Sequence, residues 1–215
     1  MNNLLSSERY YFQRTFDHIK RVQKSALYLI LNHTEDLGLD VEDCRQLFKN
    51  VLHHDSSKFQ MQQFRAYIDF SWCKKTNTDL TDGQQYNFDK AWKNHYTVEN
   101  HHPERFVEDC GQMSKIEIIE MACDLQAMAE ELEEGNFLNY FNDVWRERQS
   151  KNFSDDFDWE QTKNLMIQIG NIFKSANIPP EELTNEDEGK TVRGEYSMIK
   201  RLCGSLEMVM KKIFE

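Results

Sequence analysis

The segment Ser114-Lys-Ile-Glu-Ile-Ile-Glu-Met-Ala-Cys-Asp-Leu-Gln-Ala-Met128 decides the fold of this 215-residue chain. Its first four residues match a capping box, in which the serine and glutamate side chains each bond to the other's backbone N–H, so we expect a helix to begin here. We expect this helix to run to about Leu132 and to end before Gly135. It is apolar on most sides, which is typical of a helix buried at the centre of a helical protein. A single aspartate, Asp124, lies inside it.

The composition favours helices along the rest of the chain. Eight glycines and three prolines leave few turn-forming residues, which argues against a turn-rich β-sandwich or barrel. Apolar residues recur at steps of three and four, and loop composition marks residues 74–83 and 184–194. We expect helices at 8–32, 40–52, 60–72, from after 83 to about 98, at 137–148, at 158–175 and from 195 onward. The prediction is an all-α chain, with one helical domain over residues 1–150 and a C-terminal helical extension over residues 151–215 packed on it.

Charge and cysteine content narrow the class of protein. The net charge of −11, from 26 basic and 37 acidic side chains, argues against general nucleic-acid binding, although a local basic pocket for a small anion stays open. The five cysteines, at 44, 73, 110, 123 and 203, contain no CxxC pair, so we expect reduced thiols and no cysteine-rich zinc site. No apolar run approaches the roughly 18 residues of a membrane span. The N-terminus lacks the features of a signal peptide, and we predict a cytoplasmic protein with no membrane partner.

The histidines are clustered rather than scattered. Six of the seven occur as His18, as His53-His54 followed by Asp55, and as His95 with His101-His102, whereas His33 stands apart. Imidazole and carboxylate ligands together favour Zn, Fe, Mn, Co or Ni over Ca. We therefore expect a divalent ion (Mn, Fe, Co, Ni, Zn or Mg) and leave a second ion open. His33 is expected to lie far from the site.

The position of Asp124 inside an apolar helix suggests that this residue binds a metal. A buried carboxylate without a partner is costly, and Glu120, one helical turn earlier, adds like-charge repulsion. A cation would relieve both problems. The alternative is that Asp124 pairs with a lysine or arginine from another helix.

His54 and Asp55 are adjacent, which separates their side chains by about 100° on a regular helix. Both can reach one ion only where the helix ends or bends, and the serines that follow favour a turn. Lys58, three residues after Asp55, would bind a phosphate oxygen that the metal also holds. His18 and His95 each have a structural alternative, as a partly buried histidine and as a residue at a helix C-terminus.

These residues carry a resemblance. His18, His54-Asp55 and Asp124 occur in the order that names the HD-domain superfamily of metal-dependent phosphohydrolases, which residues 10–135 resemble. The chain is also similar to a family of uncharacterised bacterial and phage proteins that share the motifs HD-x-SKF, HHPE and EM-x-x-D-x-x-AM, here at residues 54–59, 101–104 and 120–128. The resemblance implies an HD-domain-like helical bundle.

The resemblance also implies the ligands and the activity. His18, His54, Asp55 and Asp124 would bind one metal, and His95 with His101 or His102 would join them if two metals are bound. We include His95 and His102 in the predicted ligand set.

Lys58, His101 and Glu104 are the predicted catalytic residues, which neutralise and position a small phosphorylated, anionic substrate. The implied activity is hydrolysis of a nucleotide or other small phosphate ester by metal-activated water. Two alternatives remain: a di-iron oxygenase of the same superfamily, and a non-catalytic module that binds a nucleotide or a host protein.

Overall fold

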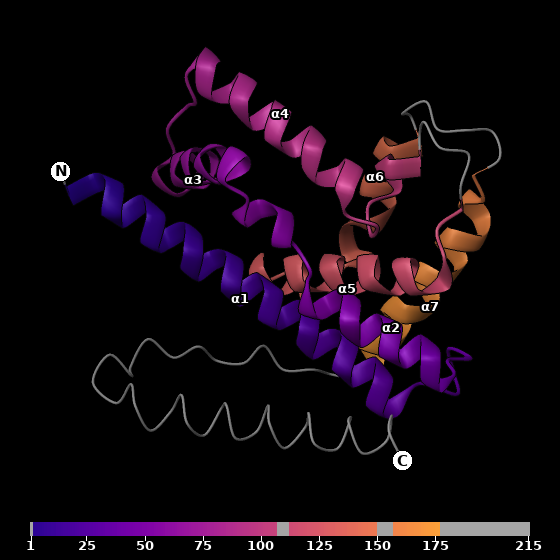
Figure 1. Ribbon diagram of the computed structural model, residues 1–215. Coiled ribbons are helices and arrows are strands. Elements are labelled where there is room, and N and C mark those ends of the chain that lie inside the picture. The colour runs from indigo at the N-terminus through magenta and orange to yellow at the C-terminus, as the bar shows by residue number, and fades with distance from the viewer. Residues whose placement is uncertain (1, 107–111, 150–156, 177–215) are drawn as a thin grey trace, which may run out of the picture.

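The computed structural model describes residues 2–106, 112–149 and 157–176 of the chain. In these ranges it contains seven α-helices, two short 3-10 helices and no strand (Figure 1). The predicted all-α fold is confirmed. The helices are α1 (Asn2–Asn32), α2 (Val41–Leu52), η1 (Ser56–Phe59), α3 (Met61–Thr76), α4 (Asp82–Val98), η2 (Pro103–Phe106), α5 (Lys115–Glu131), α6 (Leu138–Gln149) and α7 (Trp159–Ala176).

The predicted and observed helix starts agree best where the sequence contains a capping box. Ser114 accepts from the backbone N–H of Glu117, and the Glu117 side chain accepts from that of Ser114, so α5 begins at the predicted residue. Asp40 and Asp43 form the same arrangement before α2. Two helices are longer than predicted: α1 begins at residue 2, and α3 continues to residue 76. The loop predicted at 184–194 and the helix predicted from 195 lie outside the described residues.

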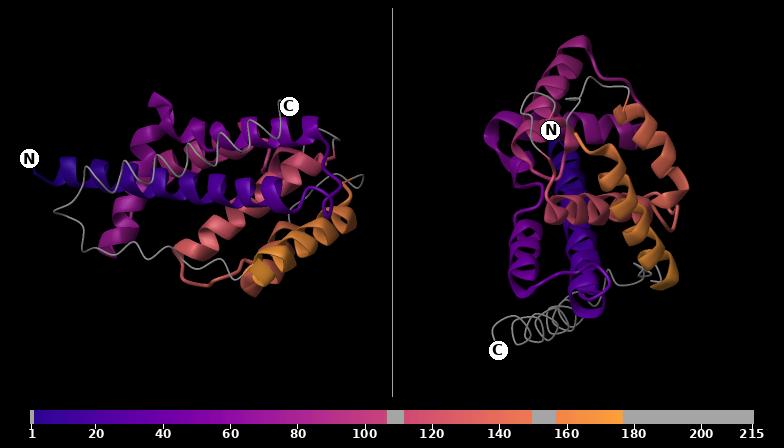
Figure 2. Two further views of the ribbon diagram at one scale, coloured as in Figure 1. Left: turned by 90° about the horizontal axis from the view of Figure 1, so that it is seen from below. Right: turned by 90° about the vertical axis from the view of Figure 1, so that its right-hand side faces the viewer.

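Helix α5 forms the centre of the fold. Eleven of its 17 residues are buried, and α1, α2 and α7 pack against it. In Figures 1 and 2, α1 runs along the length of the molecule beside α2 and α5. The core includes side chains of α1, α2, α5, α6 and α7, such as Leu29, Leu47, Ile119, Phe141 and Ile169. Each such side chain, when fully buried, contributes roughly 1.5–3 kcal/mol.

Helices α3 and α4 pair with each other, and α3 also packs on α1. A second, smaller apolar cluster fills this region, with Tyr11, Tyr67, Ile68 and Ala91 among its buried members. The pair therefore has its own core beside the one around α5.

Helix α7 extends the main core beyond residue 150. Met166, Ile169 and Phe173 belong to the same apolar cluster as the buried side chains of α5. The carbonyl of Gly170 on α7 accepts a 3.0 Å hydrogen bond from the Asn136 side chain, just before α6. In the described part of the chain, no helix is both long and apolar enough to cross a bilayer. Cys44, Cys73 and Cys123 form no disulfide in the described part of the chain.

Candidate metal centre

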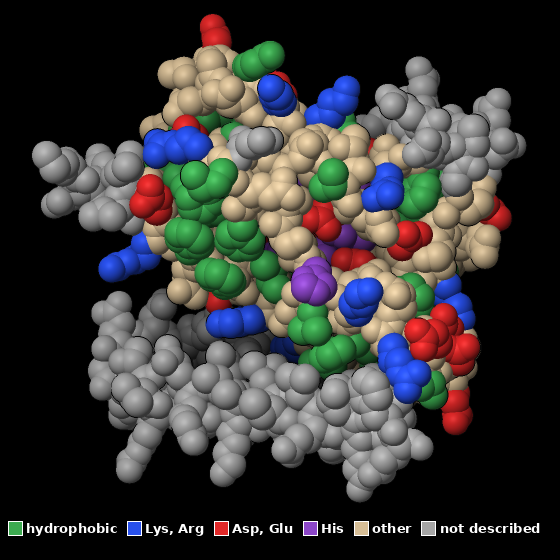
Figure 3. All heavy atoms as spheres, in the orientation of Figure 1, with side chains coloured by type: hydrophobic (Ala, Val, Ile, Leu, Met, Phe, Trp, Pro, Cys, Tyr) green, Lys and Arg blue, Asp and Glu red, His purple; other side chains and the backbone are tan. Residues whose placement is uncertain are grey.

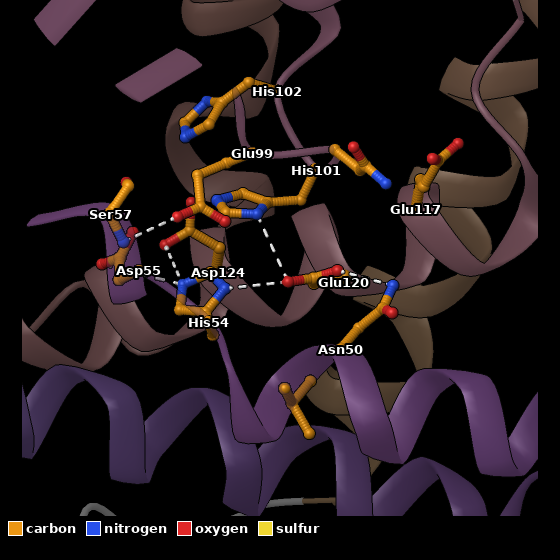
Figure 4. Close-up of polar contacts among 12 residues, drawn as sticks. Asn50, His54, Asp55, Ser57, Glu99, His101, His102, Glu117, Glu120 and Asp124 are labelled. Carbon is orange, nitrogen blue, oxygen red and sulfur yellow. Dashed lines mark hydrogen bonds and ion pairs between the residues drawn. The ribbon is translucent and has the colours of Figure 1, made fainter. Parts of the chain in front are cut away.

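Four helices bring the predicted ligands together. His18 is on α1, His54 and Asp55 follow the end of α2, His95 is on the last turn of α4, and Asp124 is on α5. Ligand atoms of His18, His54 and Asp124 lie within 4.8 Å of one another, as do those of His54, Asp55 and His101. Figure 4 shows several of these side chains pointing toward one another from separate elements.

The backbone at Asp55 allows adjacent residues to share one centre. Helix α2 ends at Leu52, and Asp55 adopts a left-handed conformation with φ 60° and ψ 13° immediately before η1. This region costs a residue with a side chain on the order of 1 kcal/mol or more, and such strain concentrates at functional sites. The predicted bend in the chain at His54-Asp55 is present.

Four side chains form the first ligand group. His18 Nε2 lies 3.0 Å from Asp124 Oδ1 and 3.6 Å from Asp55 Oδ2. His54 Nε2 lies 3.7 Å from the same Asp124 oxygen and 3.8 Å from the same Asp55 oxygen. Ligand atoms about 2.1 Å from one cation are separated from each other by roughly 3 to 3.8 Å. The donor set and spacing of His18, His54 and Asp124 therefore fit one divalent ion, with Asp55 Oδ2 beside the two imidazoles.

A second group consists of imidazoles. Ligand atoms of His95, His101 and His102 lie within 4.8 Å of one another, and the Nε2 atoms of His95 and His102 are 2.9 Å apart. The other oxygen of Asp55, Oδ1, lies 3.4 Å from His95 Nε2. Asp55 thus directs one carboxylate oxygen to each group.

Glu120 supports the site from behind His54. Its Oε1 atom lies 3.0 Å from His54 Nδ1 and 3.3 Å from His101 Nδ1. Its other oxygen accepts a 3.0 Å hydrogen bond from Asn50 Nδ2. A carboxylate bound to Nδ1 of an imidazole fixes the tautomer that leaves Nε2 available to a metal. The Glu120 side chain, one turn before Asp124, therefore orients a ligand.

Ser57 orients His95 in a comparable way. The hydroxyl of Ser57 lies 2.8 Å from His95 Nδ1, and the Ser57 backbone N–H donates to Glu99 Oε1 at 3.1 Å. Helix α4 ends at Val98 because Glu99 is extended, with φ −90° and ψ 125°. The chain then turns, so that His101 and His102 return toward His95.

The acidic groups of the site are held in their charged forms. Burial opposes ionisation of Asp55 and Asp124, but neighbouring positive groups outweigh it and keep the pKa of both carboxyls well below its usual range. Burial also opposes ionisation of Glu120, yet hydrogen bonds from His101 and His54 lower its pKa to about 2. Burial disfavours the charged form of His54, but Asp55, Asp124 and Glu120 raise its pKa to about 10. This cluster of carboxylates attracts positive charge.

The pKa of His95 is shifted in the direction opposite to that of His54. Burial, together with the nearby charge of Lys58, lowers its pKa to about 3. A neutral imidazole retains a lone pair on one nitrogen, which is the form that binds a metal.

Several buried polar atoms of the site have no hydrogen-bond partner. They include His54 Nε2 and Asp55 Oδ1, both of which face a ligand group. Leaving a buried polar atom without a partner costs about 1–3 kcal/mol. A cation in each group would satisfy these atoms, so the residues present fit a metal.

A cavity of about 590 Å³ opens onto the cluster. His18, Asp55, His95, His102 and Asp124 form one part of its wall. In Figure 3, histidine and acidic side chains are visible in a recess near the centre of the face shown. The rest of the wall contains two cations, an acidic side chain and aromatic rings: Arg14, Lys58, Asp89, Tyr67, Phe70, Phe88 and Trp92.

The three predicted catalytic residues lie in different places. The Nζ atom of Lys58 lines the cavity and lies 2.6 Å from Asp55 Oδ2. His101 is buried with its ring against those of His54 and His102, and it does not line the cavity. Glu104 does not line the cavity either, since its Oε2 lies behind His102, 3.9 Å from Nδ1.

Two other histidines lie outside the site. The Nδ1 atom of His33 is 2.7 Å from Asp36, and its Nε2 is 3.0 Å from the Tyr28 hydroxyl, so it belongs to a separate polar group. His53 is exposed. The sequence analysis did not identify Asn50, Ser57 and Glu99. Ser57 lies within the HD-x-SKF motif, but nothing in the sequence indicates that Asn50 and Glu99 reach the centre.

The fold and the site define the class: an all-α protein with a buried His/Asp cluster suited to a metal ion. The chain matches a family described as "Family of unknown function (DUF5662)" over residues 7–173, and it belongs to that family. The match includes every residue of the cluster. No curated protein and no solved structure matches the chain.

Proposed function

We propose that this protein is a metal-dependent phosphohydrolase that acts on a nucleotide or another small phosphate ester. The observation that carries the proposal is the position of Asp55. Its Oδ2 lies 3.6 Å from His18 Nε2 and its Oδ1 lies 3.4 Å from His95 Nε2, so one carboxylate joins two imidazole groups at the end of a cavity. A buried carboxylate in a strained backbone conformation, surrounded by four helices, indicates a site for chemistry.

His18, His54, Asp55 and Asp124 would hold the first divalent ion, and His95 and His102 would hold a second beside Asp55 Oδ1. A bound divalent ion would supply a polarised phosphoryl oxygen and an activated water. The order of these ligands along the chain and their convergence from α1, α2, α4 and α5 support an HD-domain-like bundle.

The remaining residues would hold and orient the ester. Lys58 and Arg14 are the cations among the residues that line the cavity. Because the net charge is −11, an anionic substrate needs such local positive charge to be held at all. His101 Nδ1 lies 3.3 Å from Glu120 and Glu104 lies 3.9 Å from His102 Nδ1. His101 would therefore orient Glu120 and His54, and Glu104 would orient His102, so both would act through other residues of the cluster rather than on the substrate.

A second candidate activity is an oxygen-dependent cleavage that uses two irons. The observation that favours it is the second group, in which the Nε2 atoms of His95 and His102 are 2.9 Å apart beside Asp55. Iron at two equivalents per chain, with a visible absorption band, would support this candidate over hydrolysis.

The test begins with metal analysis of the purified full chain. Phosphate release is then measured on a panel of nucleotides and simple phosphate esters with Mn, Co, Ni, Mg, Zn or Fe. We expect metal-dependent release by the native protein, loss of metal and release in Asp55→Ala, and no change in Asp36→Asn, which alters an exposed aspartate outside the site.

Two results would overturn the proposal. If Asp55→Ala kept full metal content and full activity, Asp55 would be neither a metal ligand nor needed for the reaction. Tight nucleotide binding without turnover, across all metals, would instead favour a non-catalytic binding module.

A further inference from the structure

The wall of the cavity beyond the ligand cluster is aromatic. Tyr67 and Phe70 on α3 and Phe88 and Trp92 on α4 line it, together with the side chain of Met128. The cavity volume of about 590 Å³ lies within the roughly 300–1,000 Å³ typical of small-molecule sites. The cavity can therefore hold more than a phosphate group.

The aromatic rings are arranged in order from the metal cluster outward. On α4, Phe88, Trp92 and His95 are spaced by four and three residues, so they share one face of the helix. The Tyr67 ring lies 6.2 Å from that of His95, edge to face. The Phe70 and Phe88 rings stack at 3.9 Å, and Phe70 is about one helical turn, roughly 5 Å, further along α3 than Tyr67.

Trp92 is the unusual member of this wall. It is 42% exposed although the rings of Phe88, His95 and His102 lie within 6.2 Å of it. Because Trp92 lines the cavity and keeps part of its ring accessible, it can stack against a planar ligand there. Stacking on another planar ring would complete its burial.

Charge distinguishes the two ends of the cavity. Lys58 Nζ lies 2.6 Å from Asp55 and over the ring of Tyr67, so its charge is at the inner end. Asp89, six residues before His95 on α4, places a carboxylate about 9 Å along the helix from the cluster. It accepts one hydrogen bond, from Gln85, through Oδ1. A carboxylate there repels a second phosphate and accepts a hydrogen bond from an N–H group of a base, such as the exocyclic amino group of adenine.

From this order of groups we propose that the outer half of the cavity is a subsite for a nitrogen-containing aromatic ring, with Trp92 as the stacking residue and Asp89 as the hydrogen-bond acceptor. The substrate class is then a nucleoside monophosphate, with its phosphate at Lys58 and its base at Trp92. The phosphate end of this assignment rests on the proposed function, whereas the ring subsite rests on the aromatic wall alone.

The ring subsite is tested without metal or phosphate. The metal-free full chain, in the presence of a chelator, is titrated with adenosine, and the heat of binding is recorded by calorimetry. We expect saturable binding to the native protein, its loss in Trp92→Ala and weaker binding to Trp92→Phe. Tyr86→Ala is the matched control, because Tyr86 is an aromatic residue on the same helix, is 69% exposed and does not line the cavity.

Specificity is tested with metal present. The ratio of kcat/KM for adenosine monophosphate to that for glycerol phosphate should exceed one in the native protein. It should fall by about tenfold or more in Trp92→Ala, since stacking of one base is worth about that factor. Asp89→Asn should lower the ratio of kcat/KM for adenosine monophosphate to that for benzyl phosphate, an alkyl ester whose ring has no N–H donor.

The outcomes separate the two proposals. Hydrolysis of glycerol phosphate with no binding of adenosine, and with an unchanged ratio in Trp92→Ala, would overturn the ring subsite and leave the phosphohydrolase standing. Binding of adenosine that depends on Trp92, without turnover of any ester, would support the subsite and overturn the hydrolase. A preference for benzyl phosphate over the nucleotide would overturn the assignment of a nucleotide.

Discussion

The Oε1 atom of Glu120 lies 3.0 Å from Nδ1 of His54, on the side of the imidazole opposite the ligand group. His54 Nε2, at the other end of the ring, lies 3.7 Å from Asp124 and 3.8 Å from Asp55. Glu120 and Asp124 are one turn apart on α5, so one helix supplies both a proposed ligand and the group that orients its neighbour. The like charges on successive turns of a buried helix are tolerated because His54 lies between them.

Replacing Glu120 should weaken metal binding without removing a ligand. Glu120→Gln loses the charge that fixes the His54 tautomer, and such changes in a supporting residue cost about 10- to 100-fold in metal affinity. Competition with a chromogenic chelator measures the dissociation constant. Glu130→Gln, on the same helix, is the control, and equal affinities in the two variants would contradict the role assigned to Glu120.

Metal should stabilise the native protein but not a variant that lacks a first-group ligand. At a free metal concentration of 100 times Kd, binding contributes about 2.7 kcal/mol. The melting temperature should therefore be higher with Mn or Zn than without it for the native chain and for the control His33→Ala. For His18→Ala the two melting temperatures should be equal. A full metal-induced shift in His18→Ala would show that His18 is not a ligand.

Metal stoichiometry should depend on the second group. We expect two ions per native chain and one ion in His102→Ala, because Asp55 directs one oxygen to each group. Metal analysis after gel filtration gives the count. One ion in the native chain, unchanged in His102→Ala, would restrict the site to the first group.

The sequence predicted those features that depend on local pattern. The start of α5 followed from the capping box at Ser114. The clustering of His18, Asp55 and Asp124 was implied by the resemblance to the HD-domain superfamily, and the cost of a buried charge indicated only that Asp124 needs a cationic partner. The bend at His54-Asp55 was expected because adjacent residues on a regular helix diverge. The helix start and the bend need only residues close together in the chain, whereas the ligand set, which joins distant residues, needed the resemblance.

Other features depend on backbone geometry that the pattern does not specify. His101 and His102 follow His95 by six and seven residues, so their place beside His95 in the predicted ligand set rested on the resemblance and not on helical spacing. They return to His95 because Glu99 is extended and ends α4. Likewise, the spacing of Phe88 and Trp92 is that of ordinary core residues, and only the structure shows that they line a cavity.

Gly170→Ala should destabilise the packing of α7 on α6. A Cβ at Gly170 would lie 2.5 Å from Leu138 Cγ, and overpacking of this kind costs about 1–3 kcal/mol against a gain of about 1 kcal/mol in helix propensity. We expect the melting temperature to fall by about 2–4 °C. Gly83→Ala on α4 meets nothing within 4 Å and should not lower it. Equal stability of the two variants would contradict the close contact.

Replacing Lys58 should separate substrate binding from metal binding. Lys58 Nζ lies 2.6 Å from Asp55 Oδ2, the oxygen that also faces His18 and His54, so its ammonium competes with a cation for this carboxylate. Lys58→Met keeps the aliphatic stem and removes the charge. Metal affinity should stay the same or rise, whereas KM for a phosphate ester should rise by about 10- to 100-fold, the value of a hydrogen bond to a charged group. Steady-state kinetics at saturating metal, with the exposed Lys90→Met as control, measure the effect. If Lys58→Met instead lost its metal and kept its KM at high metal concentration, Lys58 would support Asp55 and would not bind the substrate.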